Sequence, residues 1–238
     1  MVLAGGMCKE RGACAGWLVF TETLSVPRAS QRVKFQPAPC RTCQPPCRIL
    51  DNRTLSFPDL YRKELTKTLE AIDAARVEQV IEVMRSARDT GHRIFTCGNG
   101  GSASSASHFV CDMVKGASYG RDRRFKIMAL TDQMPAISAY ANDVGYEAVF
   151  VEQLKNFAES GDVLLAISGS GNSPNVLRAV EYAKSTGCTT IGFTGRGGGK
   201  LASLVDLSIV IDSQHMGRIE DAHMIMCHMI GYYFMEQD

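Results

Sequence analysis

The chain has 238 residues, of which 45% are apolar, 21% charged and 8% aromatic. This composition is typical of a globular protein with one large or two small domains, and it excludes a wholly disordered chain. The net charge of +1 hides two unlike segments, because residues 1–50 carry 7 Lys/Arg against 2 Asp/Glu whereas residues 51–238 carry 19 against 23. No apolar run approaches the roughly 20 residues of a membrane-spanning helix, which argues against a membrane protein. The acidic body, with one short basic run at residues 121–126, argues against a nucleic-acid partner.

The first fifty residues form a basic tail unlike the rest of the chain. They hold five of the nine cysteines and five of the eight prolines. Because they show neither helical nor strand periodicity, we predict that residues 1–50 are largely disordered. The alternative is a metal site at Cys40, Cys43 and Cys47, but a closed zinc site needs a fourth ligand, and no histidine lies nearby. A wrongly assigned start, with the true one near residue 50, is a further alternative.

The four cysteines of the body are Cys97, Cys111, Cys188 and Cys227. They are scattered, and three of them lie inside apolar runs. This spacing indicates reduced packing residues rather than a disulfide framework. We therefore expect a cytoplasmic protein.

Residues 51–238 are predicted to form one α/β domain. Two helical patterns come first, an apolar stripe from residue 59 to residue 72 and a second helix that Asp73 caps and Gly91 ends. Short apolar runs typical of buried strands then alternate with helical patterns. The predicted strands span residues 94–97, 126–130, 163–167, 189–194 and 207–211, and the predicted helices span residues 102–115, 134–140, 146–160, 174–185 and 216–236. Strands joined by helix-length connections predict a doubly wound α/β fold, with a five-stranded parallel sheet flanked by helices and a helical N-terminal extension.

Two glycine-rich loops, residues 98–102 (GNGGS) and residues 168–173 (SGSGNS), each follow a predicted strand and precede a helix. Glycine lets backbone amides turn toward an anion, serine hydroxyls add donors, and a helix N-terminus adds positive partial charge, so these loops suit a small phosphomonoester. The first loop fits a dinucleotide fingerprint, but the acidic residue expected about 20 positions further on is missing. Neither loop contains the Gly-Lys-Ser/Thr of a Walker loop. The alternative is two tight turns that bind no ligand.

Two polar pairs on helices are candidate metal ligands. His108 and Asp112 lie four residues apart on the helix after the first loop, so both side chains project from one face. Glu220 and His228 lie eight residues apart on the last helix, loosely on one side. Nitrogen and oxygen ligands of this kind suit zinc or a similar divalent metal, and polar residues bonded within the protein are the alternative. His223, between the second pair, is either a functional histidine or a packing residue.

The loops and polar pairs belong to a longer series of motifs. In chain order the series comprises residues 98–102, His108-Phe109, Asn142-Asp143-x-Gly145, residues 168–173, Thr194-Gly195, and Arg218-Ile219 followed by His228. With this series, which runs from about Leu60 to the C-terminus, the chain resembles the phosphoheptose isomerases, a family of the sugar isomerase (SIS) fold. The resemblance implies a homotetramer with active sites at subunit boundaries. It also implies conversion of sedoheptulose 7-phosphate to D-glycero-D-manno-heptose 7-phosphate for lipopolysaccharide or glycan synthesis, often with bound zinc.

The resemblance assigns a role to each matching residue. Asp112 and His228 would be the catalytic pair that transfers a proton between C1 and C2 through an enediol. The implied zinc ligands are His108, Asp112, Glu220 and His228. The implied substrate-binding residues are Asn99, Gly100, Gly101, Ser102, Asp112, Asn142, Asp143, Ser168, Gly169, Ser170, Ser173 and Glu220, among which Ser168, Ser170 and Ser173 would hold the phosphate.

The sequence departs from the family pattern at four positions. Asp112 stands where a glutamate is usual, Glu220 where a glutamine is usual, and Gly169 where a threonine is usual. Gly116 stands where an arginine is expected. These changes weaken the assignment of the exact substrate more than that of the reaction class. Two alternatives stay open, an isomerase or sensor for another phosphosugar and a non-catalytic SIS protein that binds a replication initiator.

Overall fold

Residues 55–237 are described by the structure, a computed structural model. The predictions on residues 1–50, including the cysteine cluster and the start of the chain, lie outside these residues. Within residues 55–237, no helix is both long enough and apolar enough to cross a membrane.

Two helices precede the sheet, α1 (Phe57–Glu70) and α2 (Ala74–Thr90). The Asp73 carboxylate accepts hydrogen bonds from backbone N–H groups in the first turn of α2, which otherwise have no partner within the helix. Gly91 ends α2 with a φ of 77°, a left-handed conformation that costs glycine little. The predicted cap and stop are therefore both present.

Five parallel strands form one sheet in the order β2-β1-β3-β4-β5. Their bounds are β1 (Arg93–Gly98), β2 (Lys126–Ala129), β3 (Val163–Ser168), β4 (Thr189–Gly195) and β5 (Leu207–Ile211). The chain passes from β1 outward to β2, then returns to β3 on the other side of β1 and continues to β5. This confirms the predicted doubly wound fold. The order reverses between β1 and β3, and such a switch point is where sheets of this kind bind ligands.

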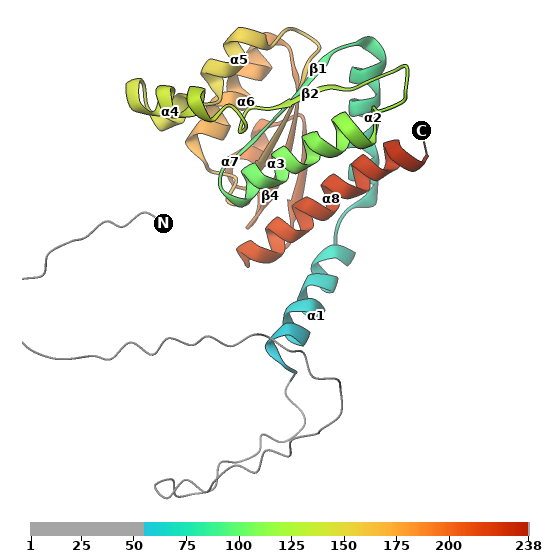
Figure 1. Ribbon diagram of the computed structural model, residues 1–238. Coiled ribbons are helices and arrows are strands. Elements are labelled where there is room, and N and C mark those ends of the chain that lie inside the picture. The colour runs from blue at the N-terminus through green and yellow to red at the C-terminus, as the bar shows by residue number, and fades with distance from the viewer. Residues whose placement is uncertain (1–54, 238) are drawn as a thin grey trace, which may run out of the picture. The chain divides into compact units, whose positions relative to one another are not determined.

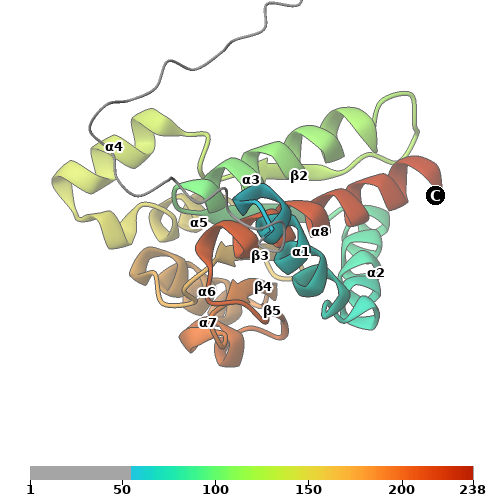
Figure 2. The same cartoon turned by 90° about the horizontal axis from the view of Figure 1, so that it is seen from below.

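Helices cover both faces of this sheet (Figures 1 and 2). The remaining helices are α3 (Gly101–Cys111), α4 (Met134–Asp143), α5 (Val151–Phe157), α6 (Pro174–Thr186), α7 (Gly199–Leu204) and α8 (Met216–Glu236). Successive strand side chains enter different cores, because Ile94 packs with residues of α2, α3 and α8 whereas Phe95 packs with residues of α5, α6 and α7. Both faces of the sheet are therefore buried, as a parallel sheet requires.

The helices differ from the predicted pattern in three places. The helix predicted at residues 102–115 is α-helical only to Cys111 and continues as a π-helical turn over Asp112–Gly116. The helix predicted at residues 146–160 consists of a 3₁₀ turn, Tyr146–Ala148, followed by α5. The short helix α7 was not predicted, because it begins in a run of glycines that is typical of a loop.

Candidate functional site

A cavity of about 250 Å³ lies at the switch point of the sheet, beyond the carboxyl ends of β1 and β3. Gly98, the last residue of β1, pairs with Ile167 of β3, so the two glycine-rich loops emerge side by side. The predicted substrate-binding residues that line the cavity are Asn99, Gly100, Gly101, Ser102, Ser168, Gly169, Ser170, Ser173 and Glu220. Segments some seventy residues apart in the sequence thus meet in one polar cavity.

Close backbone packing explains the glycines of these loops. A Cβ atom on Gly98 would lie 2.8 Å from Ser102 and 2.9 Å from the carbonyl oxygen of Ile167. A Cβ atom on Gly171 would lie 2.0 Å from the carbonyl oxygen of Gly198, and Gly171 has a φ of 64°. Any larger side chain would push the loops apart, so glycine is required for the cavity to form.

The second loop presents hydroxyl groups at the N-terminus of α6. The hydroxyls of Ser168 and Ser173 lie 3.3 Å apart, and the Ser170 hydroxyl accepts a hydrogen bond from the backbone N–H of Asn172 at 3.2 Å. The Asn172 side chain in turn accepts from the backbone N–H of Lys200 at 3.1 Å, which ties the loop to α7. Hydroxyl donors fixed at the positive end of a helix can bind a phosphate.

Glu220 lies in this cavity rather than beside the other predicted metal ligands. A Cβ atom on Gly101 would lie 2.5 Å from Oε1 of Glu220, so the carboxylate packs directly over the first loop. Eight residues of α8, a rise of about 12 Å, separate Glu220 from His228. The carboxylate therefore belongs to the wall of the cavity, next to the first glycine-rich loop.

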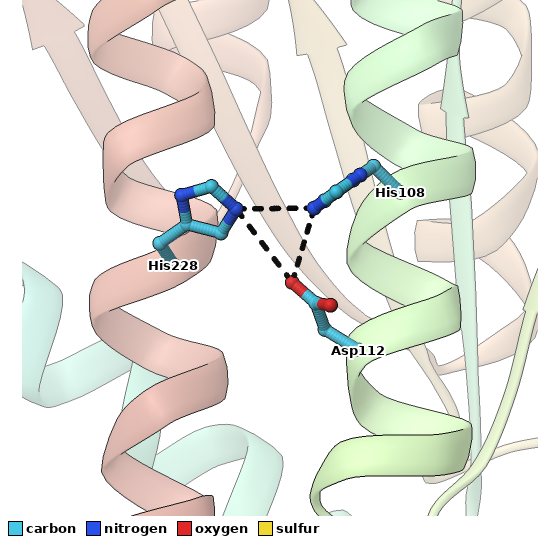
Figure 3. Close-up of side chains that lie close together, drawn as sticks. All are labelled: His108, Asp112 and His228. Atoms are coloured by element: carbon cyan, nitrogen blue, oxygen red, sulfur yellow. Dashed lines mark hydrogen bonds and ion pairs between the residues drawn. The ribbon is translucent and has the colours of Figure 1, made fainter.

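The other three predicted ligands, His108, Asp112 and His228, do converge (Figure 3). The Nε2 atoms of the two histidines are 3.1 Å apart. Oδ2 of Asp112 lies 3.4 Å from Nε2 of His108 and 3.8 Å from Nε2 of His228. The group joins α3 and the π-helical turn after it to α8, and Figures 1 and 2 both show α3 and α8 side by side.

Local backbone features place Asp112 in this group. Asp112 opens the π-helical turn, and such turns are frequent at functional sites. Gly231 of α8 faces it, because a Cβ atom on Gly231 would lie 3.6 Å from Cβ of Asp112. A residue with no side chain at position 231 leaves room for the aspartate between the two helices.

The group fits a divalent metal ion. Oδ2 of Asp112 is buried and has no hydrogen-bond partner among the described residues, which is costly unless another group satisfies it. The two imidazoles and the carboxylate are zinc ligands by type, and one ligand atom from each lies within 4.8 Å of the others. His108 and His228 are both about half exposed, so a small ion and a substrate can reach them.

Three predicted substrate-binding residues do not line the cavity: Asp112, which lies with the two histidines, and the neighbouring Asn142 and Asp143. Asn142 and Asp143 are exposed at the end of α4, where the Asn142 side chain donates to the Asp143 carboxylate at 2.7 Å. Neither residue lines the cavity of the single chain.

His223 is a buried packing residue in this chain. Its side chain is fully buried, and its Nε2 lies 3.1 Å from the carbonyl oxygen of Thr194 at the end of β4. Burial lowers the pKa of His223 to about 4, and the hydrogen bond to Thr194 opposes this shift only in part. The imidazole is therefore neutral at pH 7, and it holds the last helix against the sheet.

Sequence reasoning did not single out Asn175 and Tyr146, although both contact the first loop. The side chains of Asn99 and Asn175 hydrogen-bond to each other twice, at 2.8 and 2.9 Å, and the Tyr146 hydroxyl donates to Asn99 Oδ1 at 3.0 Å. The available signal was an asparagine two residues after the second loop, at a helix position that is buried in the structure.

Comparison with known proteins identifies relatives of this arrangement. The model of the SIS domain family matches residues 60–195. A phosphoheptose isomerase of Aliarcobacter butzleri is 37% identical over 171 residues, which cover 71% of this chain and 89% of that protein. The solved structure of a phosphoheptose isomerase from Neisseria gonorrhoeae is similar with a TM-score of 0.67 and 31% identity, over 74% of this chain and 95% of the other. A phosphoheptose isomerase from Francisella tularensis has a TM-score of 0.70 at 26% identity, over 76% and 97% of the two chains.

Proposed function

The chain is a phosphosugar isomerase of the SIS domain family, related to the phosphoheptose isomerases, and we propose that it converts sedoheptulose 7-phosphate to D-glycero-D-manno-heptose 7-phosphate. The product would supply heptose precursors for lipopolysaccharide or glycans. The observation that carries the proposal is the cavity in which both glycine-rich loops meet. The group of His108, Asp112 and His228 lies further along the two helices that contribute Gly101 and Glu220 to this cavity. Since the chain is an isomerase, the non-catalytic alternative is set aside.

We propose that a seven-carbon phosphosugar extends from the serine loop along α3 toward His108. Ser168, Ser170 and Ser173 would hold the phosphate, and Asn99 with Gly101 would face the sugar. His108 follows Gly101 by seven residues, a rise of about 10 Å along the helix. An extended chain from phosphorus to C1 of a heptose phosphate spans eight bonds, also about 10 Å. The reacting carbons would therefore reach the histidine and aspartate group.

The residues of that group can carry the isomerisation. One member of the Asp112 and His228 pair removes a proton from C1 of the ketose, which gives an enediolate with its negative charge on O2. The pair then returns a proton to C2 and moves the O1 proton toward O2, so that the carbonyl shifts from C2 to C1 and the atoms balance. A carboxylate and an imidazole can divide these steps near neutral pH.

A zinc ion would be held by His108, Asp112 and His228. Two histidines and one carboxylate are typical of catalytic zinc sites, which keep one position for water or substrate. When bound, the ion supplies positive charge that stabilises an enediolate. Glu220, predicted as a fourth ligand, is proposed instead to contact the sugar, because its carboxylate lies over Gly101.

The test is isomerisation of sedoheptulose 7-phosphate in deuterated water, with EDTA and again with added zinc. We expect an aldose that carries deuterium at C2, and a rate that falls in EDTA and returns with zinc. No exchange under either condition would contradict the proposal. Asn156→Ser, an exposed substitution on α5, serves as the matched control and is expected to keep the wild-type rate.

The carboxylate of Glu220 in the cavity favours one second candidate, an isomerase for a different phosphosugar. A carboxylate accepts hydrogen bonds from hydroxyls and repels anions, so it selects among sugars by the positions of their hydroxyls. Ketose phosphates of five, six and seven carbons, compared under the same conditions, would separate the candidates. A kcat/KM highest for a five- or six-carbon substrate would favour this second candidate.

We also propose a cytoplasmic homotetramer. Met229 and Tyr232 on α8 are about half exposed, and apolar surface of this kind is typical of an interface between copies. Burial raises the pKa of the Cys97 and Cys227 thiols to about 12, so both stay protonated and unreactive, as suits packing residues in a reducing compartment. Sedimentation equilibrium is expected to give four times the chain mass, and a monomer would contradict the assembly.

A further inference from the structure

A small hydrogen-bond network connects Asn99, in the first glycine-rich loop of the cavity, to Asn175 and Tyr146. Asn99 lines the cavity directly after β1, whereas Asn175 lies in the first turn of α6 and is 1% exposed. The two side-chain amides face each other in a reciprocal pair, with Asn99 Nδ2 donating to Asn175 Oδ1 at 2.9 Å and Asn175 Nδ2 donating to Asn99 Oδ1 at 2.8 Å. The pair connects the two glycine-rich loops of the site.

The direction of this pair is fixed by the backbone. The N–H of Val176 donates to Asn175 Oδ1 at 3.0 Å, and a backbone N–H can only donate. Oxygen of Asn175 must therefore face Val176 and Asn99 Nδ2, which leaves the Asn175 amide nitrogen to face Asn99 Oδ1. A flip of either amide would set two donors or two acceptors against each other.

Tyr146 adds a second constraint on Asn99. Its hydroxyl donates to Asn99 Oδ1 at 3.0 Å, so that oxygen receives two hydrogen bonds and both of its lone pairs are used. The Asn99 amide nitrogen carries two hydrogens and donates one of them to Asn175 Oδ1. None of residues 55–237 accepts a hydrogen bond from the other hydrogen. Because Asn99 lines the cavity, this N–H can donate to a molecule bound there.

We propose that Asn175 and Tyr146 are positioning residues that hold the Asn99 amide so that it presents an N–H donor, and not its oxygen, to an oxygen of the sugar. The inference rests on the proposed function, because it takes the occupant of the cavity to be a phosphosugar. A donor at this point selects for a hydroxyl or carbonyl oxygen on the carbon chain. Neither positioning residue lines the cavity itself.

The test is a double-mutant cycle with Asn175→Ser and Asn99→Ala, measured on sedoheptulose 7-phosphate. Loss of one neutral hydrogen bond is expected to lower kcat/KM by roughly 3- to 10-fold, chiefly through KM. Each single variant should show this loss, and the double variant should lose no more than Asn99→Ala alone, because Asn175 acts through Asn99. Asn156→Ser controls for the substitution itself.

A second readout separates positioning from damage to the fold. Inorganic phosphate, used as a competitive inhibitor, should bind Asn175→Ser as tightly as wild type, because the serine loop that holds phosphate is intact. Multiplicative losses in the double variant, or an equal weakening for inorganic phosphate, would overturn the inference. If circular dichroism shows that Asn175→Ser is unfolded, Tyr146→Phe at the exposed end of the network replaces it in the same cycle.

The outcomes for the inference and for the proposed function are distinct. A wild-type protein that leaves sedoheptulose 7-phosphate unchanged overturns the proposed function and this inference with it. A wild-type protein that turns the substrate over, while Asn175→Ser and Tyr146→Phe both keep its kcat/KM, overturns the inference alone.

Discussion

Protonation of His223 should destabilise the folded chain at mildly acidic pH. Its pKa is lowered to about 4 by burial, from an ordinary value near 6.5 that the unfolded chain retains. Between these two values the unfolded state binds a proton that the folded state does not. The free energy of unfolding is therefore unaffected above about pH 7, falls as the pH drops below 6.5, and levels off below about 4.

The size of the effect follows from the two pKa values. At pH 5 the difference in proton binding destabilises the fold by about 2 kcal/mol, and below pH 4 by about 3 kcal/mol. His223→Gln removes the titrating group and keeps an amide N–H that can reach the Thr194 carbonyl oxygen. On going from pH 7.5 to pH 5, the wild type should lose about 2 kcal/mol more stability than the variant.

Urea unfolding followed by circular dichroism measures this difference. Protein concentration is held fixed and EDTA is present, so that assembly and metal binding do not change between the two proteins. The measurement at pH 7.5 gives the cost of the substitution itself, which cancels from the comparison. Equal losses in wild type and variant between pH 7.5 and pH 5 would show that protonation of His223 does not destabilise the fold.

Three further substitutions test separate parts of the site. Asp112→Asn should lower the zinc content of the protein, measured by atomic emission, and reduce kcat by about 100- to 10,000-fold. Retention of wild-type kcat would rule out Asp112 as a catalytic group. Glu220→Gln removes a negative charge from the cavity. It should lower the inhibition constant of inorganic phosphate, a competitive inhibitor, about 3-fold, since like charges repel. An unchanged inhibition constant would place the carboxylate away from the phosphate. Gly171→Ala sets a Cβ atom 2.0 Å from the carbonyl oxygen of Gly198 and should cost about 1–3 kcal/mol in urea unfolding, whereas an unchanged midpoint would show that the loops move apart freely.

The strands and most helices followed from local patterns because each depends on a short stretch of chain. A run such as Val163–Ser168 is buried on both faces, so its apolar side chains are continuous in the sequence. Helix α7 was missed by the same patterns. The glycines at its start, Gly198 and Gly199, are typical of a loop, and the helix has one buried residue. The π-helical turn at Asp112 left no pattern, since it depends on backbone hydrogen bonds shifted by one residue, such as that from the N–H of Ala117 to the carbonyl oxygen of Asp112.

For the site, the chemical groups could be predicted from residue types and spacing, but their partners could not. Periodicity on α8 places Glu220 and His228 loosely on one side of the helix, yet it says nothing about what lies opposite each residue. The same limit applies to Asn175, whose partner Asn99 is 76 residues away. Hydrogen-bond partners at that distance are set by how loops and helices pack.

Residue patterns alone predict a doubly wound sheet, two loops suited to phosphate, and a set of histidines and carboxylates that could hold a metal. Packing in three dimensions divides that set, because it places His108, Asp112 and His228 in one group and Glu220 in the cavity over Gly101. The physical reason is that the alignment of α3 and α8 comes from burying their apolar sides in one core, and from the small Gly231 that lets them approach. Such an alignment arises between segments more than a hundred residues apart, which no local pattern records.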